Sequence, residues 1–158
     1  MMEYNIAQLN LARMIAPIDS PIMADFVNNL DRINNLAENS IGFVWRLKGE
    51  EENATTLRVF SDEFLIINMS VWDNLNSLFE FTYNTDHVGI MKRKKEWFSK
   101  MKEMHMVLWY IKEGDTPSPD EAKERLAYLR EHGETPHAFS FKSRFTTDHL
   151  ANYKVITS

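Results

Sequence analysis

Histidine is the side chain best suited to acid–base chemistry near neutral pH, and the chain has 5 histidines. His87 is the strongest candidate for a catalytic residue. On a helix beginning there it would share a face with Met91 and Phe98, among apolar side chains. A neutral imidazole in such surroundings can act as a general base or bind haem iron. The alternative is a structural histidine that caps the helix or is hydrogen-bonded at its start.

The other histidines do not suggest a metal site. His105, His132, His137 and His149 are scattered, and no HExxH motif occurs. The chain has no cysteine, which excludes a disulfide framework, a thiolate zinc site and a cysteine nucleophile. The sequence therefore predicts no bound metal and no resident cofactor.

Polar residues in the middle of two predicted strands form a second candidate site. Gln8 and Asn10 share one face of the first strand, and Asn68 and Ser70 share one face of a later strand. Polar groups at the centre of a sheet must be hydrogen-bonded or hydrated. They predict either a lumen that orients a mostly apolar ligand or a hydrated dimer interface in which the amides are satisfied.

Aromatic and cationic residues could complete such a lumen. Its predicted walls are Trp45, Trp72, Trp97 and Trp109. Whether Trp45 or Arg46 points into the lumen depends on strand register, which the sequence does not fix. Arg93 belongs to a basic run that is usually a solvated helix face, but its guanidinium can make a bidentate pair with an anion or with a carboxylate of the fold.

The amino-acid composition makes several classes of function poor candidates. The 158 residues carry 18 Lys and Arg against 23 Asp and Glu, and a net charge of -5 disfavours nucleic acids and anionic membranes as partners. No apolar stretch is long enough to span a bilayer, and the first residues lack the features of a signal peptide. With only 5 Gly and no phosphate-cradling glycine loop, a nucleotide enzyme is a poor candidate. A cytoplasmic protein is the expectation.

Two kinds of periodicity divide the chain into elements. Period-two alternation predicts strands over 4–13, 41–47, 63–72, 105–111 and 138–145. Helical spacing predicts helices over 20–37, 73–83, 87–101 and 118–132, with Ser20 and Asp73 as N-caps. Ser118 or Asp120 starts the last helix, and Gly133 closes it. The second and third strands should form a hairpin.

This order predicts an α+β fold of the ferredoxin-like βαββαβ type, with an antiparallel sheet and an extra C-terminal helix and strand. Residues 1–145 form a single domain, and residues 146–158 are a C-terminal tail of uncertain role. Helices on one side of the sheet leave an apolar face bare on the other. A homodimer through this open sheet face would cover it and enclose a lumen.

Several segments resemble a known family. They are AQLNLARM (7–14), MADFVNNLDRINNLAENS (23–40), GFVWRL (42–47), SVWDNLNSLFEFTYNTDHVGIMKRKKEWF (70–98) and LWYIKEGDTPSPDEAKERLAYLREHGETPHAFSF (108–141). Together they are similar to the bacterial family called domain of unknown function 3291, of the dimeric alpha-beta barrel superfamily. Tyr110 stands where a second tryptophan is common. The resemblance is expected to end at Phe145.

The resemblance implies a range of functions, because relatives in the superfamily include cofactor-independent monooxygenases, haem-binding enzymes and small polyketide-modifying proteins. The first hypothesis is a small-molecule-binding protein or enzyme with an apolar lumen in a homodimeric barrel. Its reaction would be monooxygenase-like or isomerase-like, on a small apolar ligand of aromatic or polyketide-like type, and haem is the one cofactor the resemblance makes possible. The alternative is a non-catalytic dimeric module for structure or binding.

Overall fold

The computed structural model describes residues 3–48, 62, 64–84 and 87–157, without the side chains of Asn84 and His87. The strands are β1 (Tyr4–Met14), β2 (Phe43–Arg46), β3 (Leu65–Trp72), β4 (Phe98–Ser99) and β5 (Met106–Lys112). The helices are α1 (Ala24–Glu38), α3 (Leu75–Asn84), α4 (His87–Lys92), α5 (Pro119–His132) and α6 (Thr147–Ala151), with 3-10 turns η1 (Pro21–Met23) and η2 (Lys94–Glu96). No helix in the described part is long and apolar enough to cross a membrane.

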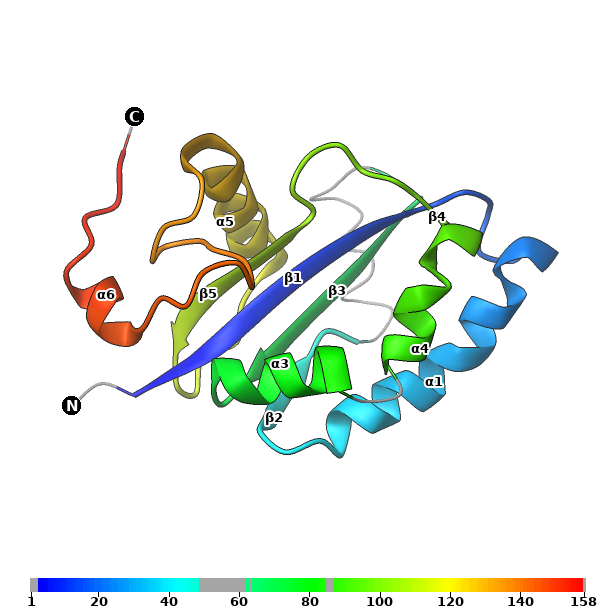
Figure 1. Cartoon of the computed structure of the whole chain (residues 1–158), viewed down its shortest axis with the longest axis horizontal. Coiled ribbons are helices and arrows are strands. Elements are labelled where there is room, and N and C mark those ends of the chain that lie inside the picture. The colour runs from blue at the N-terminus through cyan, green and yellow to red at the C-terminus, as the bar shows by residue number, and fades with distance from the viewer. Residues whose placement is uncertain (1–2, 49–61, 63, 85–86, 158) are drawn as a thin grey trace.

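The five strands form one antiparallel sheet with β1 in the middle (Figure 1). β3 pairs with one edge of β1, and β2 pairs with β3. β5 and β4 pair with different lengths of the other edge of β1. The predicted α+β class, antiparallel sheet and pairing of the second and third strands are confirmed.

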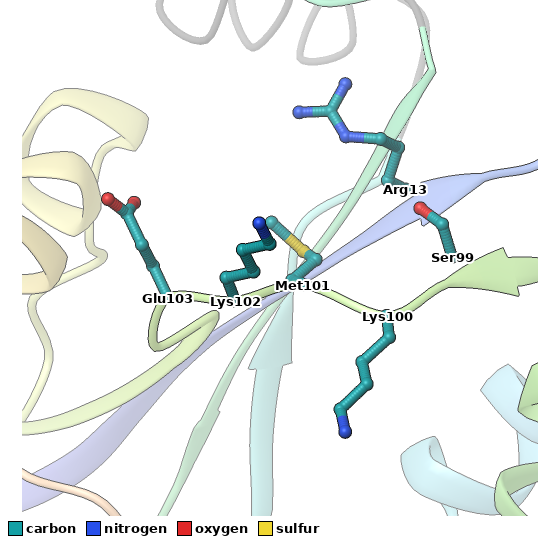
Figure 2. Close-up of a pocket in the computed structure, with 6 residues that line it drawn as sticks. All are labelled: Arg13, Ser99, Lys100, Met101, Lys102 and Glu103. Carbon is teal, nitrogen blue, oxygen red and sulfur yellow. The ribbon is translucent and has the colours of Figure 1, made fainter.

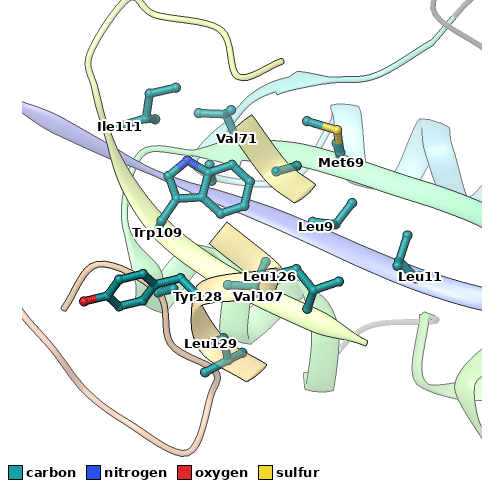
Figure 3. Close-up of a cluster of buried hydrophobic side chains, with 13 residues drawn as sticks. Leu9, Leu11, Met69, Val71, Val107, Trp109, Ile111, Leu126, Tyr128 and Leu129 are labelled. Atoms are coloured by element: carbon teal, nitrogen blue, oxygen red, sulfur yellow. The ribbon is translucent and has the colours of Figure 1, made fainter. Parts of the chain in front are cut away.

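One face of the sheet packs against α5. Leu9, Val71 and Trp109, from β1, β3 and β5, are 0% exposed in a cluster with Leu126 and Leu129 of α5 (Figure 3). Those two leucines lie three apart, on one side of the helix. The expectation that this face is bare is therefore wrong where α5 lies over β1 and β5. The homodimer inferred from it stays a prediction.

The helix predicted over 87–101 is wrong beyond Lys92. Phe98 and Ser99 instead form β4 and pair with Met14 and Arg13 of β1. The chain leaves the helix because Trp97 is buried, with its ring centroid 5.6 Å from that of Phe26. Tertiary packing of this kind outweighs the weak preference of a short helix to continue.

The strand predicted over 138–145 is also wrong. There the described chain makes two isolated bridges, from Phe139 to Leu108, with backbone N···O distances of 2.7 and 3.0 Å, and from Ala138 to Thr135. The carboxylate of Glu134 accepts a 2.8 Å hydrogen bond from the backbone N–H of Ser140, and the Ser140 hydroxyl shares its one proton between the two carboxylate oxygens at 3.1 and 3.0 Å. These bonds turn the chain back after the bridges, so that no further ladder forms.

Two of the predicted caps differ from the structure. Ser20 makes no capping bond, since the 3-10 turn η1 intervenes before α1. Asp73 does not cap α3, because Asn74 takes that place and its Oδ1 accepts a 2.8 Å bond from the N–H of Ser77. Of the two starts that the sequence leaves open, Ser118 and not Asp120 caps α5, and Gly133 follows its last residue with φ of 75°.

The C-terminal tail packs on α5. Tyr153 lies against the cluster on that face, and its hydroxyl is hydrogen-bonded to the hydroxyl of Tyr128 of α5. The Tyr128 oxygen also accepts a 3.0 Å bond from the N–H of Ile156. Residues after Phe145 are therefore attached to the body of the fold.

Candidate functional site

Four polar side chains lie together at the centre of the other face of the sheet. They are Gln8, Asn10, Asn68 and Ser70, which we call the amide patch. The register of β1 and β3 puts Gln8 opposite Ser70 and Asn10 opposite Asn68. Since side chains alternate along a strand, all four point away from α5. The grouping expected from the sequence is therefore formed.

Two apolar clusters flank the amide patch on its own face. One joins the sheet to α1 and α3, with buried members Ile6, Ala37, Trp72, Leu78, Phe81, Leu108 and Phe139. The other joins the far end of β1 to α1, with buried members Met14, Ala16, Met23, Phe26 and Trp97. Because α1 contributes to both, it passes alongside the patch. The amide patch therefore lies between two apolar clusters.

Ser70 is the centre of a small hydrogen-bond network in the patch. Its Oγ accepts a 2.9 Å bond from Nε2 of Gln8 and a 3.0 Å bond from Nε1 of Trp72. Both lone pairs of the hydroxyl are then used, and its own proton can still be donated. Ser70 is only 5% exposed, so this network is a fixed part of the protein.

Asn10 and Asn68 differ from Ser70 because both are exposed. Neither carboxamide has a hydrogen-bond partner among the residues that the structure describes. Each carboxamide offers two donors and one acceptor oxygen. Two unused amides facing each other on the central strands can recognise hydroxyl or carbonyl groups of a bound molecule.

The bulge in β2 decides which neighbour joins the patch. The register shifts between Phe43 and Trp45, and Arg46 comes opposite Ser70. Trp45 packs instead against the cluster under α5. Nε of Arg46 donates a 2.8 Å bond to Oε1 of Glu38, so that its charge is balanced at the edge of the patch.

The other predicted site residues lie elsewhere. Trp109 is buried under α5, on the same face as Trp45. The guanidinium of Arg93 lies over the Trp97 ring at 4.7 Å, and it donates bonds of 2.9 and 2.8 Å to Asp25 and Glu96. The hydrogen bonds to Glu96 and Asp25 raise the pKa of Arg93. Ligand-binding roles for these residues stay predictions.

His87 begins α4, but its side chain lies outside the described part of the structure. Its catalytic role therefore stays a prediction, and so does haem binding. Within the described residues, no three side chains of the His, Asp and Glu types are grouped closely enough to hold a metal ion.

His137 is a buried titratable residue that the sequence did not single out. Its Nδ1 lies 3.0 Å from Nη1 of Arg125, and its Nε2 lies 3.1 Å from Oε1 of Glu124. A guanidinium can only donate, so Nδ1 accepts and Nε2 carries the proton. Burial lowers the pKa of His137, the bond with Glu124 opposes this, and the charge of Arg125 adds to it. With both nitrogens occupied, His137 is a brace between α5 and the following chain. No local sequence signal marks this contact, since its partners lie 12 and 13 positions away.

Comparison with known proteins relates this chain to one family. No curated protein matches the sequence. The chain is similar in structure to the NE2512 protein of unknown function from Nitrosomonas europaea, with a TM-score of 0.46, 9% identity, and coverage of 74% of this chain and 96% of that one. The family model described as Domain of unknown function (DUF3291) matches residues 5–155. The expectation that the resemblance ends at Phe145 is therefore wrong, and the chain belongs to the DUF3291 family over nearly its whole length.

Proposed function

We propose that the protein binds a small, mostly apolar organic molecule over the amide patch. The observation that carries this proposal is the exposure of Asn10 and Asn68, directly opposite each other on the two central strands, without hydrogen-bond partners among the described residues. Helices cover both ends of the same face. Binding sites for small molecules commonly combine apolar walls with a few well-placed polar groups.

The charges around the patch indicate the type of ligand. The four residues of the patch carry no charge. Arg46, opposite Ser70, is paired with Glu38, which Lys48 also approaches at 3.9 Å. A neutral molecule that offers one or two hydroxyl or carbonyl groups would match the two amides. An aromatic or polyketide-like molecule fits this description, and oxygenation or isomerisation is the chemistry we propose to assay on it, with His87 as the candidate base.

Binding can be tested with 1-naphthol, a neutral aromatic alcohol, as the probe. In an NMR titration we expect saturable shifts of the side-chain amides of Asn10 and Asn68. The double variant Asn10→Ala with Asn68→Ala should weaken binding about tenfold, since two modest hydrogen bonds are lost. Asn28→Ala, at an exposed position on α1, is the matched control and should leave the affinity unchanged. Equal weakening by both variants, or shifts elsewhere only, would contradict the proposal.

A non-catalytic module is the second candidate, and one observation favours it. Trp72 and Trp97 are 1% exposed and Trp109 is 0% exposed. These tryptophans, which were expected to line a lumen, are instead buried in the core. A protein of this kind would show no saturable shift with naphthol, while its tryptophans would serve stability alone.

We further propose the ferredoxin-like arrangement and the homodimer. The path β2-β3-β1 with β5 on the far edge of β1, and helices following β1 and β3, supports the first. Trp45 and Ile67, which are only half-buried at the edge of the α5 cluster, support contact with a second copy there. Light scattering at micromolar concentration should report twice the mass of one chain, and a stable monomer would contradict the dimer. A cytoplasmic location also remains a prediction.

A further inference from the structure

The connection from β4 to β5 forms a pocket of about 410 Å³. Its lining residues are Arg13, Ser99, Lys100, Met101, Lys102 and Glu103 (Figure 2). Arg13 alternates with the residues of the amide patch along β1, so it points to the opposite face of the sheet. The volume lies in the range of about 300–1,000 Å³ that small-molecule sites occupy. The pocket is therefore separate from the site proposed above and large enough for a small ligand.

The charges at the pocket do not cancel. Arg13 is paired with Asp62, and Glu103 lies 3.3 Å from Nη1 of Arg130. Each of these pairs is neutral. Of the other lining residues, Lys100 and Lys102 have no carboxylate partner in the part of the chain that the structure describes. In a protein whose net charge is -5, the pocket lining therefore carries unpaired positive charge.

The direction of the side chains decides which lysine charge lies in the pocket. Figure 2 shows Arg13, Met101 and Lys102 on one side of the chain, while the Lys100 side chain runs to the other. Nη1 of Arg13 is bonded to Asp62, but the structure gives no partner to its other N–H groups or to the Ser99 hydroxyl among the described residues. An ammonium, part of a guanidinium and a hydroxyl thus remain as donors around one space.

An apolar surface lies beside these donors. Met101 is half-buried and packs against the cluster under α5, where it presents a flexible thioether side chain to the pocket. Free donors with a cation select an acidic group, and the methionine favours a carbon chain attached to it.

We propose that this pocket binds a small organic anion through its carboxylate or phosphate group. Lys102 supplies the charge, Arg13 and Ser99 supply further hydrogen bonds, and Met101 contacts the apolar part of the ligand. The binding needs no conformational change in the sheet, because Arg13 and Ser99 are already placed by the pairing of β1 with β4.

The proposal is tested by NMR titration of the full chain with butyrate and, separately, with inorganic phosphate. At least one should give saturable shifts of the backbone amides of residues 99–103, with a Kd of about 10 mM for so small a probe. The tighter of the two identifies the acidic group that the pocket prefers. If neither butyrate nor phosphate bound saturably, the proposal would be overturned.

Two lysines, one in the pocket lining and one outside it, provide a matched pair of variants. Lys102→Gln should raise Kd about fivefold or more, because it removes the free charge in the pocket. Lys112→Gln removes the same charge from an exposed position outside the pocket, next to Tyr4 at the other end of β1, so it should change Kd by less than about twofold. The amide spectrum of each variant shows whether it is folded. Equal effects would mean that only the overall field of the protein attracts the anion, and the pocket would then not be the site.

Discussion

Replacement of Trp109 by alanine should lower the free energy of unfolding by about 3–5 kcal/mol, as measured by chemical denaturation. The side chain is 0% exposed and fills the space between the sheet and α5. Its removal deletes a large apolar surface and leaves a cavity that α5 can close only in part. Hydrogen exchange should accordingly become faster in α5 than in α1, which covers the other face.

Two further substitutions provide controls for this result. Trp109→Phe keeps an aromatic ring but removes the indole N–H, which is buried and has no hydrogen-bond partner within the described part of the chain. It should cost clearly less than the alanine variant, because the loss of an unpaired donor offsets part of the lost volume. Trp45→Ala, at the half-buried edge of the same cluster, should also cost less. If Trp45→Ala were as damaging as Trp109→Ala, the close packing of α5 on this face would be contradicted.

Gly42→Ala should lower the free energy of unfolding by more than about 2 kcal/mol. Gly42 has φ of 86°, a conformation that costs other residues about 1–2 kcal/mol. An added Cβ would also clash with Oδ1 of Asp73 and with Oγ and Cβ of Ser77. The backbone there cannot retreat easily, because the carbonyl of Gly42 accepts a 2.7 Å bond from the N–H of Asp73. Thermal and chemical denaturation would both measure the loss.

Gly114 separates these two causes. Its φ is 92°, but an added Cβ would meet nothing within 4 Å. Gly114→Ala should therefore lose only the conformational part, about 1 kcal/mol. Equal losses for the two variants would show that the close approach of Gly42 to Asp73 and Ser77 is relieved by small shifts in solution.

Local signals allowed some elements to be predicted closely. α5 begins after Ser118 and ends before Gly133 as expected, because a capping serine followed by proline, and a glycine beyond the last turn, act through neighbouring residues alone. The end of α4 could not be found in this way. Whether the chain continues as a helix or turns so that Trp97 is buried depends on Phe26, far away in the sequence.

The candidate site was predictable in part for the same reason. Strand alternation alone places Gln8 and Asn10 on one face, and the structure confirms it. The choice between Trp45 and Arg46 needed the irregular register of β2, which no local pattern specifies. The position of α5 was also beyond prediction, since an amphipathic helix shows that it covers something but not which surface it covers.

The covering of the sheet by α5 has a consequence for how the protein is made. β1 is translated first, yet its neighbour β3 begins at Leu65, its neighbour β5 at Met106 and the helix over them at Pro119. Leu9 and the apolar residues beside it therefore stay exposed to solvent while more than a hundred later residues are synthesised. A nascent chain of this family should be a client of ribosome-associated chaperones until α5 has emerged.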